Sequence, residues 1–143
     1  MELVPEIYQK IEALSDKGNT FLDNGESKEA IDTWNEALAL IPDPKTDWEA
    51  SMWLHASIGD AYFHEGNFSA VKESFFNALN CPGAHENPFI HYRLGQALLK
   101  LGETDKGIDQ LLQAYMLDGD DIFLSEDGGE DYLNLLRNRG LIS

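Results

Sequence analysis

The chain has 143 residues, enough for one domain with its own core, and 43% of them are hydrophobic, as in ordinary folded proteins. Twenty-six Asp and Glu residues oppose 10 Lys and Arg, which gives a formal net charge of −16. This charge excludes nonspecific binding to nucleic acids or anionic membranes, because both surfaces would repel the chain. It favours a basic protein partner, although an acidic composition can also serve solubility alone.

The cysteine count and the absence of long apolar segments bear on the compartment. Cys81 is the one cysteine, so no intramolecular disulfide can form, and a reducing compartment fits. The N-terminal sequence has no basic stretch followed by an apolar run, and no segment reaches about 18 uninterrupted apolar residues. We therefore expect a cytoplasmic protein with neither a signal peptide nor a membrane-spanning helix.

Apolar residues recur at steps of three, four and seven, and this periodicity predicts helices along most of the chain. The first helix is expected from Pro5 to Asp23, because proline suits a first turn and Gly25 can take the left-handed conformation beyond a helix end. Ser27 is the predicted N-cap of the second helix, and Pro42 stops that helix.

Four more helices follow the same logic. Their predicted first and last signals are, in chain order, Asp47 and Gly66, Asn67 and Asn80, Asn87 and Gly102, and Thr104 and Leu117. No segment shows sustained alternation of apolar and polar residues, so we expect no sheet.

The C-terminal part differs in composition from the rest. Residues 118–131 hold seven acidic residues and no basic one. Within them Ile122, Phe123 and Leu124 form an apolar triplet that we expect to anchor this acidic loop on the preceding helices. A last short helix is predicted over residues 130–139, followed by Gly140 as a stop signal.

Three stretches share one pattern of small and large residues. Each opens with a glycine, namely Gly18, Gly59 or Gly95, and each has a large residue, a turn glycine, a bulky residue and an alanine at fixed later positions. In the order of the three stretches, these positions are Phe21, Tyr62 and Leu98; Gly25, Gly66 and Gly102; Trp34, Phe75 and Leu111; and Ala37, Ala78 and Ala114.

This pattern resembles the tetratricopeptide repeat, a helical hairpin of about 34 residues with the signature W-x2-L-G-x2-Y, then A-x3-F, then P. The first stretch matches at Gly18, Phe21, Ala30, Trp34, Ala37 and Pro42. The resemblance implies an all-α fold in which antiparallel helical hairpins stack as a short right-handed solenoid. It implies a single domain over residues 1–143, with repeats at about 11–44, 52–85 and 88–121 and an acidic loop and capping helix at 118–143. Two insertions depart from the family's length, at residues 42–48 and 82–87.

No residue pattern points to catalysis or to a metal. His55 and His91 occupy equivalent positions where the family packs a large residue, so we interpret both as packing residues. The acidic run from Asp118 resembles the start of an EF-hand loop, but Ile122 and Phe123 stand where that loop needs an oxygen ligand and a glycine. Neither a zinc-protease helix motif nor a pair of cysteines occurs. We predict a non-enzymatic protein without cofactor or metal.

In the tetratricopeptide family the first helix of each hairpin lines a concave groove that binds a peptide or a protein. The residues that the resemblance places on this groove, our candidates for partner binding, are Glu12, Asp16, Asn19, Asp23, Trp53, Ala56, Asp60, His64, Phe89, Tyr92, Arg93, Gln96 and Lys100. The family's best-known groove clamps a C-terminal carboxylate with Lys, Asn and Arg, and only Asn19 and Arg93 match that set. We therefore expect a different ligand. Trp53 and Tyr92 are either contact residues or half-buried core, and the sequence leaves both interpretations open.

These features favour a protein–protein interaction module with a locally basic partner, bound through the groove or through the acidic surface. One hypothesis is a bacterial immunity protein that neutralises a cationic toxin, such as a nuclease, by covering its active site. The alternatives are an adaptor or co-chaperone-like scaffold and a repeat protein that associates with itself as a homodimer. The sequence does not name the partner.

Overall fold

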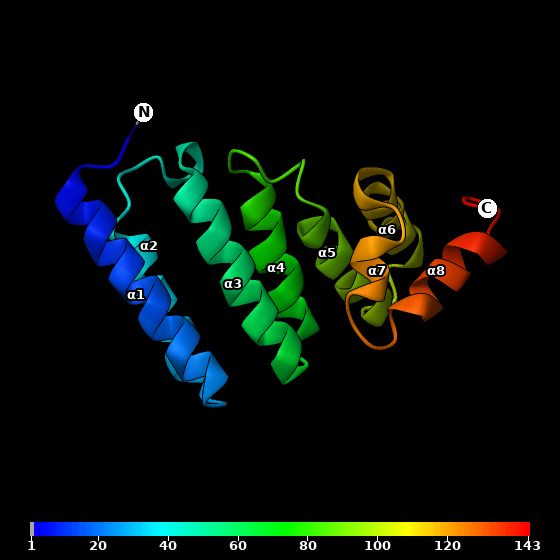
Figure 1. Cartoon of the computed structure of the whole chain (residues 1–143), viewed down its shortest axis with the longest axis horizontal. Coiled ribbons are helices and arrows are strands. Elements are labelled where there is room, and N and C mark those ends of the chain that lie inside the picture. The colour runs from blue at the N-terminus through cyan, green and yellow to red at the C-terminus, as the bar shows by residue number, and fades with distance from the viewer. Residues whose placement is uncertain (1) are drawn as a thin grey trace. The chain divides into compact units, whose positions relative to one another are not determined.

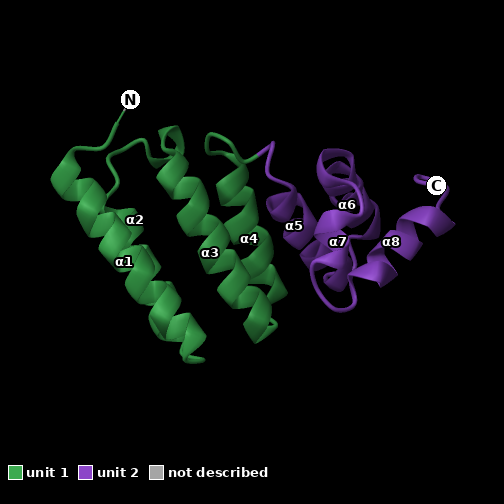
Figure 2. Ribbon diagram, viewed as in Figure 1, with its two compact units in different colours: residues 1–84 green, residues 85–143 purple. Residues whose placement is uncertain are grey.

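The structure is a computed structural model that describes residues 2–143, and these residues form helices and turns without any strand. They fall into two compact units, one ending at Ala84 and one running from His85 to Ser143, which Figure 2 shows in different colours. Across the described residues, no helix is both long enough and apolar enough to cross a bilayer. The predicted all-α fold of helical hairpins is confirmed, while the single domain over residues 1–143 stays a prediction.

The first unit consists of two helical hairpins (Figure 1). In one hairpin α1 (Pro5–Asp23) packs on α2 (Ser27–Leu40), and in the other α3 (Glu49–Glu65) packs on α4 (Phe68–Leu79). A short 3-10 helix, η1 (Lys45–Asp47), precedes α3. The two hairpins share one core because α2 packs against α3, and buried residues of both helices belong to it.

The second unit contains one hairpin and the C-terminal segment. The hairpin is formed by α5 (Pro88–Lys100) and α6 (Thr104–Asp118), and it is followed by α7 (Asp121–Leu124) and α8 (Gly129–Asn138). The predicted apolar anchor is confirmed at Phe123, which is fully buried beside Tyr92 and Leu111. It is wrong at Leu124, which is 59% exposed because it points away from the core that Phe123 fills.

The repeat glycines allow the two helices of each hairpin to approach closely. Gly18 lies directly against the indole of Trp34, which also donates a hydrogen bond from Nε1 to the Ser15 carbonyl oxygen at 3.3 Å. A Cβ atom on Gly59 would lie only 2.5 Å from the Phe75 ring, closer than van der Waals contact permits. The glycine and the bulky residue of the sequence pattern are therefore two sides of one packing contact.

The structure corrects three of the predicted N-caps, two of them at hairpin turns. Asn67 caps α4 as predicted, with its side chain accepting from the Ala70 amide at 3.3 Å. Ser27 and Thr104 were predicted in the same role, but each is the first helical residue instead. The reason is that the left-handed turn glycine is followed by one cap residue, which places the cap at Glu26 and Glu103.

The third corrected cap lies before α3. Asp47 was predicted to cap this helix, but it ends η1, and Trp48 is the residue that precedes α3. In the second unit the prediction holds for Asn87, whose side chain accepts from the Phe89 amide at 3.0 Å at the start of α5.

Candidate functional site

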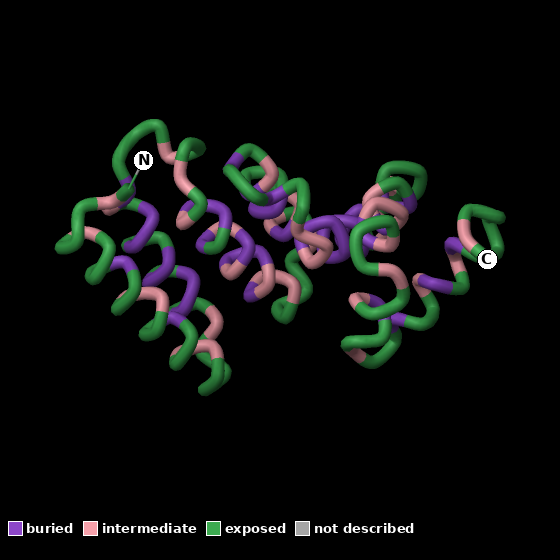
Figure 3. The backbone as a smooth tube through the Cα atoms, turned by 45° about the horizontal axis from the view of Figure 1, so that its top comes forward, coloured by how far each residue is buried: buried purple, intermediate pink, exposed green. Residues whose placement is uncertain are grey.

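The predicted site residues of α1 and α3 form an accessible face in the first unit. Glu12, Asp16, Asn19 and Asp23 are all exposed on α1, which buries only Ile11 and Gly18 and is drawn largely in the exposed colour in Figure 3. On α3, Trp53 is 54% exposed, so it is a surface residue rather than core. Ala56 was also placed on the groove, but it is buried, at 4% exposure.

Two neighbouring cavities lie between α1 and the start of α3. The smaller, of about 180 Å³, is lined by Glu12 and Trp53, so the structure brings these two predicted residues into one groove. The larger, of about 660 Å³, also contains Trp53 and adds Trp48 as a wall. Both cavities share Tyr8, Ala50 and Trp53, and they therefore form one continuous hollow.

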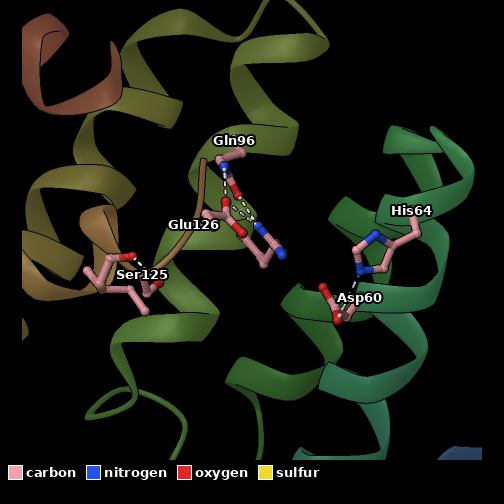
Figure 4. A network of polar contacts seen from close by, with 7 residues as sticks. Asp60, His64, Gln96, Ser125 and Glu126 are labelled. Atoms are coloured by element: carbon pink, nitrogen blue, oxygen red, sulfur yellow. Dashed lines mark hydrogen bonds and ion pairs between the residues drawn. The ribbon is translucent and has the colours of Figure 1, made fainter. Parts of the chain in front are cut away.

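Asp60 and His64 form a separate polar contact on α3. The Nε2 atom of His64 lies 3.6 Å from Oδ2 of Asp60 one helical turn earlier, as Figure 4 shows. The imidazole is exposed, and the contact is an ion pair only when that ring is protonated. His64 is the more exposed member of the pair, with 56% of its side chain accessible against 25% for Asp60.

Three predicted site residues of the second unit are buried instead of groove-facing. Tyr92, Arg93 and Gln96 are 1%, 5% and 2% exposed. Gln96 donates from Nε2 to Oε1 of Glu126 at 3.1 Å (Figure 4). Arg93 donates from Nη1 to the same oxygen at 2.8 Å. Tyr92 packs its ring against Phe123, with centroids 5.1 Å apart. The expectation of an open groove is thus wrong at these three residues, because the chain's own C-terminal segment holds them.

The groups around Glu126 explain how its half-buried side chain stays ionised. Burial acts to raise the pKa of Glu126, but the hydrogen bond and positive charge of Arg93 outweigh it, and the pKa lies below its ordinary value. Burial and then the negative charge of Glu126 raise the pKa of Tyr92. The buried Tyr92 hydroxyl forms no hydrogen bond with any described residue, so Glu126 acts on it through its charge.

The remaining two predicted residues of α5 lie at its ends. Phe89 is half-buried, and the guanidinium carbon of Arg93 lies 5.2 Å from the centroid of its ring. Lys100 is exposed in the last turn of α5. The structure therefore brings Phe89 next to Arg93 and leaves Lys100 accessible.

The sequence reasoning missed four residues that shape these regions: Tyr8, Trp48, Glu126 and Gly129. Gly129 lies against the carbonyl group of Phe123 and the hydroxyl oxygen of Tyr92, in a space where a Cβ atom would clash. The adjacent glycines at 128 and 129 were a usable signal, because paired glycines mark tight turns and close backbone approaches. Glu126 carried no such signal among the six other acidic residues of 118–131.

His55, His91 and Cys81 are half-buried or buried in the fold. His91 is buried, with Nδ1 2.7 Å from Oε1 of Gln110 and Nε2 2.9 Å from the His85 carbonyl oxygen, which confirms its interpretation as a packing residue. Burial lowers the pKa of His55 and raises the pKa of the Cys81 thiol. Residues 2–143 contain no group of three His, Cys, Asp or Glu side chains arranged to hold a metal ion.

Comparison with known proteins identifies the repeat. The family model described as tetratricopeptide repeat matches residues 90–121, which lie within the third predicted repeat. A search of curated proteins gives no match.

Several solved structures similar to this chain are tetratricopeptide repeat domains. The first such domain of Spaghetti (RPAP3), bound to an HSP90 peptide, is 19% identical with a TM-score of 0.71, over 92% of this chain and 95% of that one. The Arabidopsis OM64 domain is 15% identical with a TM-score of 0.72, over 93% and 98%. The second domain of human RPAP3, in complex with an HSP70 peptide, is 16% identical with a TM-score of 0.71, over 92% and 98%. At these identities the likeness shows the fold.

Proposed function

We propose that this chain, a tetratricopeptide repeat protein by its fold and by the sequence of residues 90–121, is a non-catalytic module that binds a protein or peptide partner. Similar domains in the solved structures hold peptides of HSP90 and HSP70, which supports binding of a protein or peptide as the activity. The partner of this chain is a different one in our proposal, namely a locally basic protein that binds the face of α1 and α3.

The observation that carries this proposal is the accessible groove that contains both Glu12 and Trp53. Asp16 and Asp23 continue the negative charge along the exposed side of α1. Complementary charge speeds encounter and selects the partner, while an exposed tryptophan supplies the kind of buried contact that dominates interface energies. The net charge of −16 acts in the same direction over longer range.

Within this class we favour an immunity protein that neutralises a cationic toxin, because such a toxin meets the charge requirement directly. The second candidate is an adaptor or co-chaperone-like scaffold, which the peptide-bound structures favour. Against carboxylate-tail binding stands Arg93, which already binds the carboxylate of Glu126 and is 5% exposed. Self-association through the same groove is the third candidate.

The test is capture of partners on immobilised protein with elution by rising salt. The site variant is Glu12→Gln with Trp53→Ala, and the control is Asp32→Asn with Glu36→Gln on the exposed side of α2. We expect a basic protein that wild type and control retain, that the site variant loses, and that moderate salt releases by screening within about 8–10 Å. Equal capture by all three would place the contact elsewhere and overturn the proposed site.

Two further measurements separate the candidates. If the captured protein is a toxin, its enzymatic activity falls when the chain is added, whereas an adaptor leaves its partner's activity unchanged. Sedimentation of the chain alone tests self-association. We also propose a cytoplasmic location, with the support that Cys81 is free and buried, as a reducing compartment allows.

A further inference from the structure

The larger cavity of the first unit has an unusual lining that the predicted groove residues do not describe. Its volume is about 660 Å³, and three aromatic side chains, Tyr8, Trp48 and Trp53, contribute to its wall. The aromatic rings at positions 8 and 53 are 53% and 54% exposed, so ring surface is available to a ligand. Such a volume accommodates a long side chain together with part of the backbone that carries it.

The insertion between the first two repeats builds one wall of this cavity. The chain leaves α2 at Ile41 and turns through η1 before α3, which brings Trp48 beside the start of α3. Its indole Nε1 donates to the Pro42 carbonyl oxygen at 2.9 Å, and this hydrogen bond fixes the orientation of the ring. The additional residues of the first repeat are thus the ones that supply an aromatic wall.

The charged groups of the cavity are all negative. Glu2 and Glu49 line the larger cavity, Glu12 lines the adjoining smaller one, and neither lining includes Lys, Arg or His. Lys45, on the neighbouring η1 turn, is not a lining residue, and its Nζ donates to the Ile41 carbonyl oxygen at 2.7 Å and forms an ion pair with Asp43 at 3.5 Å. Among residues 2–143, the lining of the site therefore has carboxylates and no cation to neutralise them.

Aromatic faces next to carboxylates attract a cation in two ways. The faces of Trp and Tyr carry negative potential and stabilise an ammonium or guanidinium group placed over them. The carboxylates add ion pairs, and the long aliphatic part of Lys or Arg covers the apolar floor. A purely apolar side chain would gain from the floor alone and would leave the carboxylates uncompensated.

We infer that the cavity formed by Tyr8, Trp48, Trp53, Glu2 and Glu49 binds an arginine or lysine side chain from a basic segment of the partner protein. Such a segment lies across the hollow, places its cation between the two tryptophans and continues toward Glu12. This inference takes the partner from the proposed function and adds the class of side chain that the partner inserts and the place where it binds.

The test uses the full chain and two blocked tripeptides, acetyl-Ala-Arg-Ala-amide and the same peptide with citrulline, which keeps the shape of arginine without its charge. The chain has three tryptophans, and their indole N–H signals in nitrogen-15 NMR spectra report the site directly. Trp48 and Trp53 line the cavity, whereas Trp34 is 1% exposed in the core and serves as an internal control.

We expect the arginine peptide to shift the signals of Trp48 and Trp53, to leave that of Trp34 unchanged, and to bind about 5- to 20-fold more tightly than the citrulline peptide. Glu49→Gln should reduce this preference by about threefold. Glu36→Gln, an exposed acidic residue of α2 outside the cavity lining, should leave it intact.

Equal affinity for the two peptides would overturn the cation site and leave an apolar groove. Absence of shifts at Trp48 and Trp53 with the arginine peptide at tens of millimolar would overturn binding in this cavity altogether. Both results are independent of the proposed function. If Glu49→Gln loses peptide preference and still captures the basic partner at wild-type salt, the inferred side-chain site fails while the proposed function stands.

Discussion

Equivalent positions of the repeat have opposite fates in the two units. Asp16 and Arg93 each stand two residues before their repeat glycine, and Asp16 is exposed while Arg93 is 5% exposed. Asn19 and Gln96 each stand one residue after it, and they differ in the same way. The repeat therefore determines which helix face a residue occupies. Whether that face is available to a partner depends on what else in the unit covers it.

In the second unit, the C-terminal segment covers the face of α5 that carries Arg93 and Gln96, because Glu126 contacts both residues. We call this surface the closed face. The Arg93 guanidinium is expensive to bury alone, and Glu126 compensates it with a hydrogen bond and an opposite charge. In the first unit, α1 exposes the acidic residues Asp16 and Asp23, and α3 exposes Trp53. We call this surface the open face. The contrast supports our proposal that an external partner binds the first unit.

The largest expected effect comes from removing the apolar anchor of the closed face. Phe123→Ala should lower the free energy of unfolding by about 3–5 kcal/mol, because a fully buried ring leaves a cavity beside Tyr92. Leu124→Ala is the matched control, since its side chain is 59% exposed, and should change it by about 0.5 kcal/mol or less. Urea unfolding followed by circular dichroism measures both. Similar losses for the two variants would mean that α7 does not anchor through Phe123.

A smaller effect is expected from removing the charge of the closed face. Glu126→Gln should lower the free energy of unfolding at neutral pH by about 1–2 kcal/mol, the scale of a hydrogen bond to a charged partner. Because the folded pKa of Glu126 lies below the ordinary value of 4.5, its contribution is present above that value and is lost as pH falls through the folded pKa.

The pH dependence makes this prediction specific. The difference between wild type and Glu126→Gln should be constant from about pH 6 to 8 and should shrink below about pH 4.5. Asp127→Asn removes an exposed carboxylate next to it and is the control. A difference that grows on acidification would contradict the assigned role of Arg93 in lowering the pKa of Glu126.

The sequence predicted most of the helices and the packing of each hairpin, but only part of the site. The spacing of Gly59 and Phe75 was readable because one close contact constrains both residues. The burial of Arg93 could not be predicted from the sequence, because it depends on a contact with Glu126, which lies 33 residues further along the chain. Residues 118–131 hold six other acidic residues, and nothing in the sequence marks Glu126 as the one that pairs with Arg93.

On the open face the expected cost of a substitution is smaller. Trp53→Ala should lower the free energy of unfolding by about 0.5–1 kcal/mol, because the side chain is 54% exposed and buries limited apolar area. Acrylamide should quench the fluorescence of the exposed Trp53 in the wild type, and this quenched component should be missing in Trp53→Ala. The fluorescence of the buried Trp34 should stay protected in both proteins. A loss above about 2 kcal/mol would assign Trp53 to the core and weaken the contrast between the units.

The smallest expected effect concerns the acidic residues of α1. Asp16→Asn combined with Asp23→Asn should change the free energy of unfolding by about 0.5 kcal/mol or less, because both side chains are exposed and pair with no basic side chain in the described chain. The sign should be stabilising at low salt, since the variant relieves part of the self-repulsion of a chain with net charge −16. Unfolding in low salt and in about 0.5 M salt tests this, because screening should remove the difference. If removing these two charges leaves the free energy of unfolding unchanged or raises it, folding does not explain why the aspartates lie on this face. Attraction of a partner is then the explanation. A clear loss of stability would instead make them structural, and the open face would lose its strongest electrostatic argument.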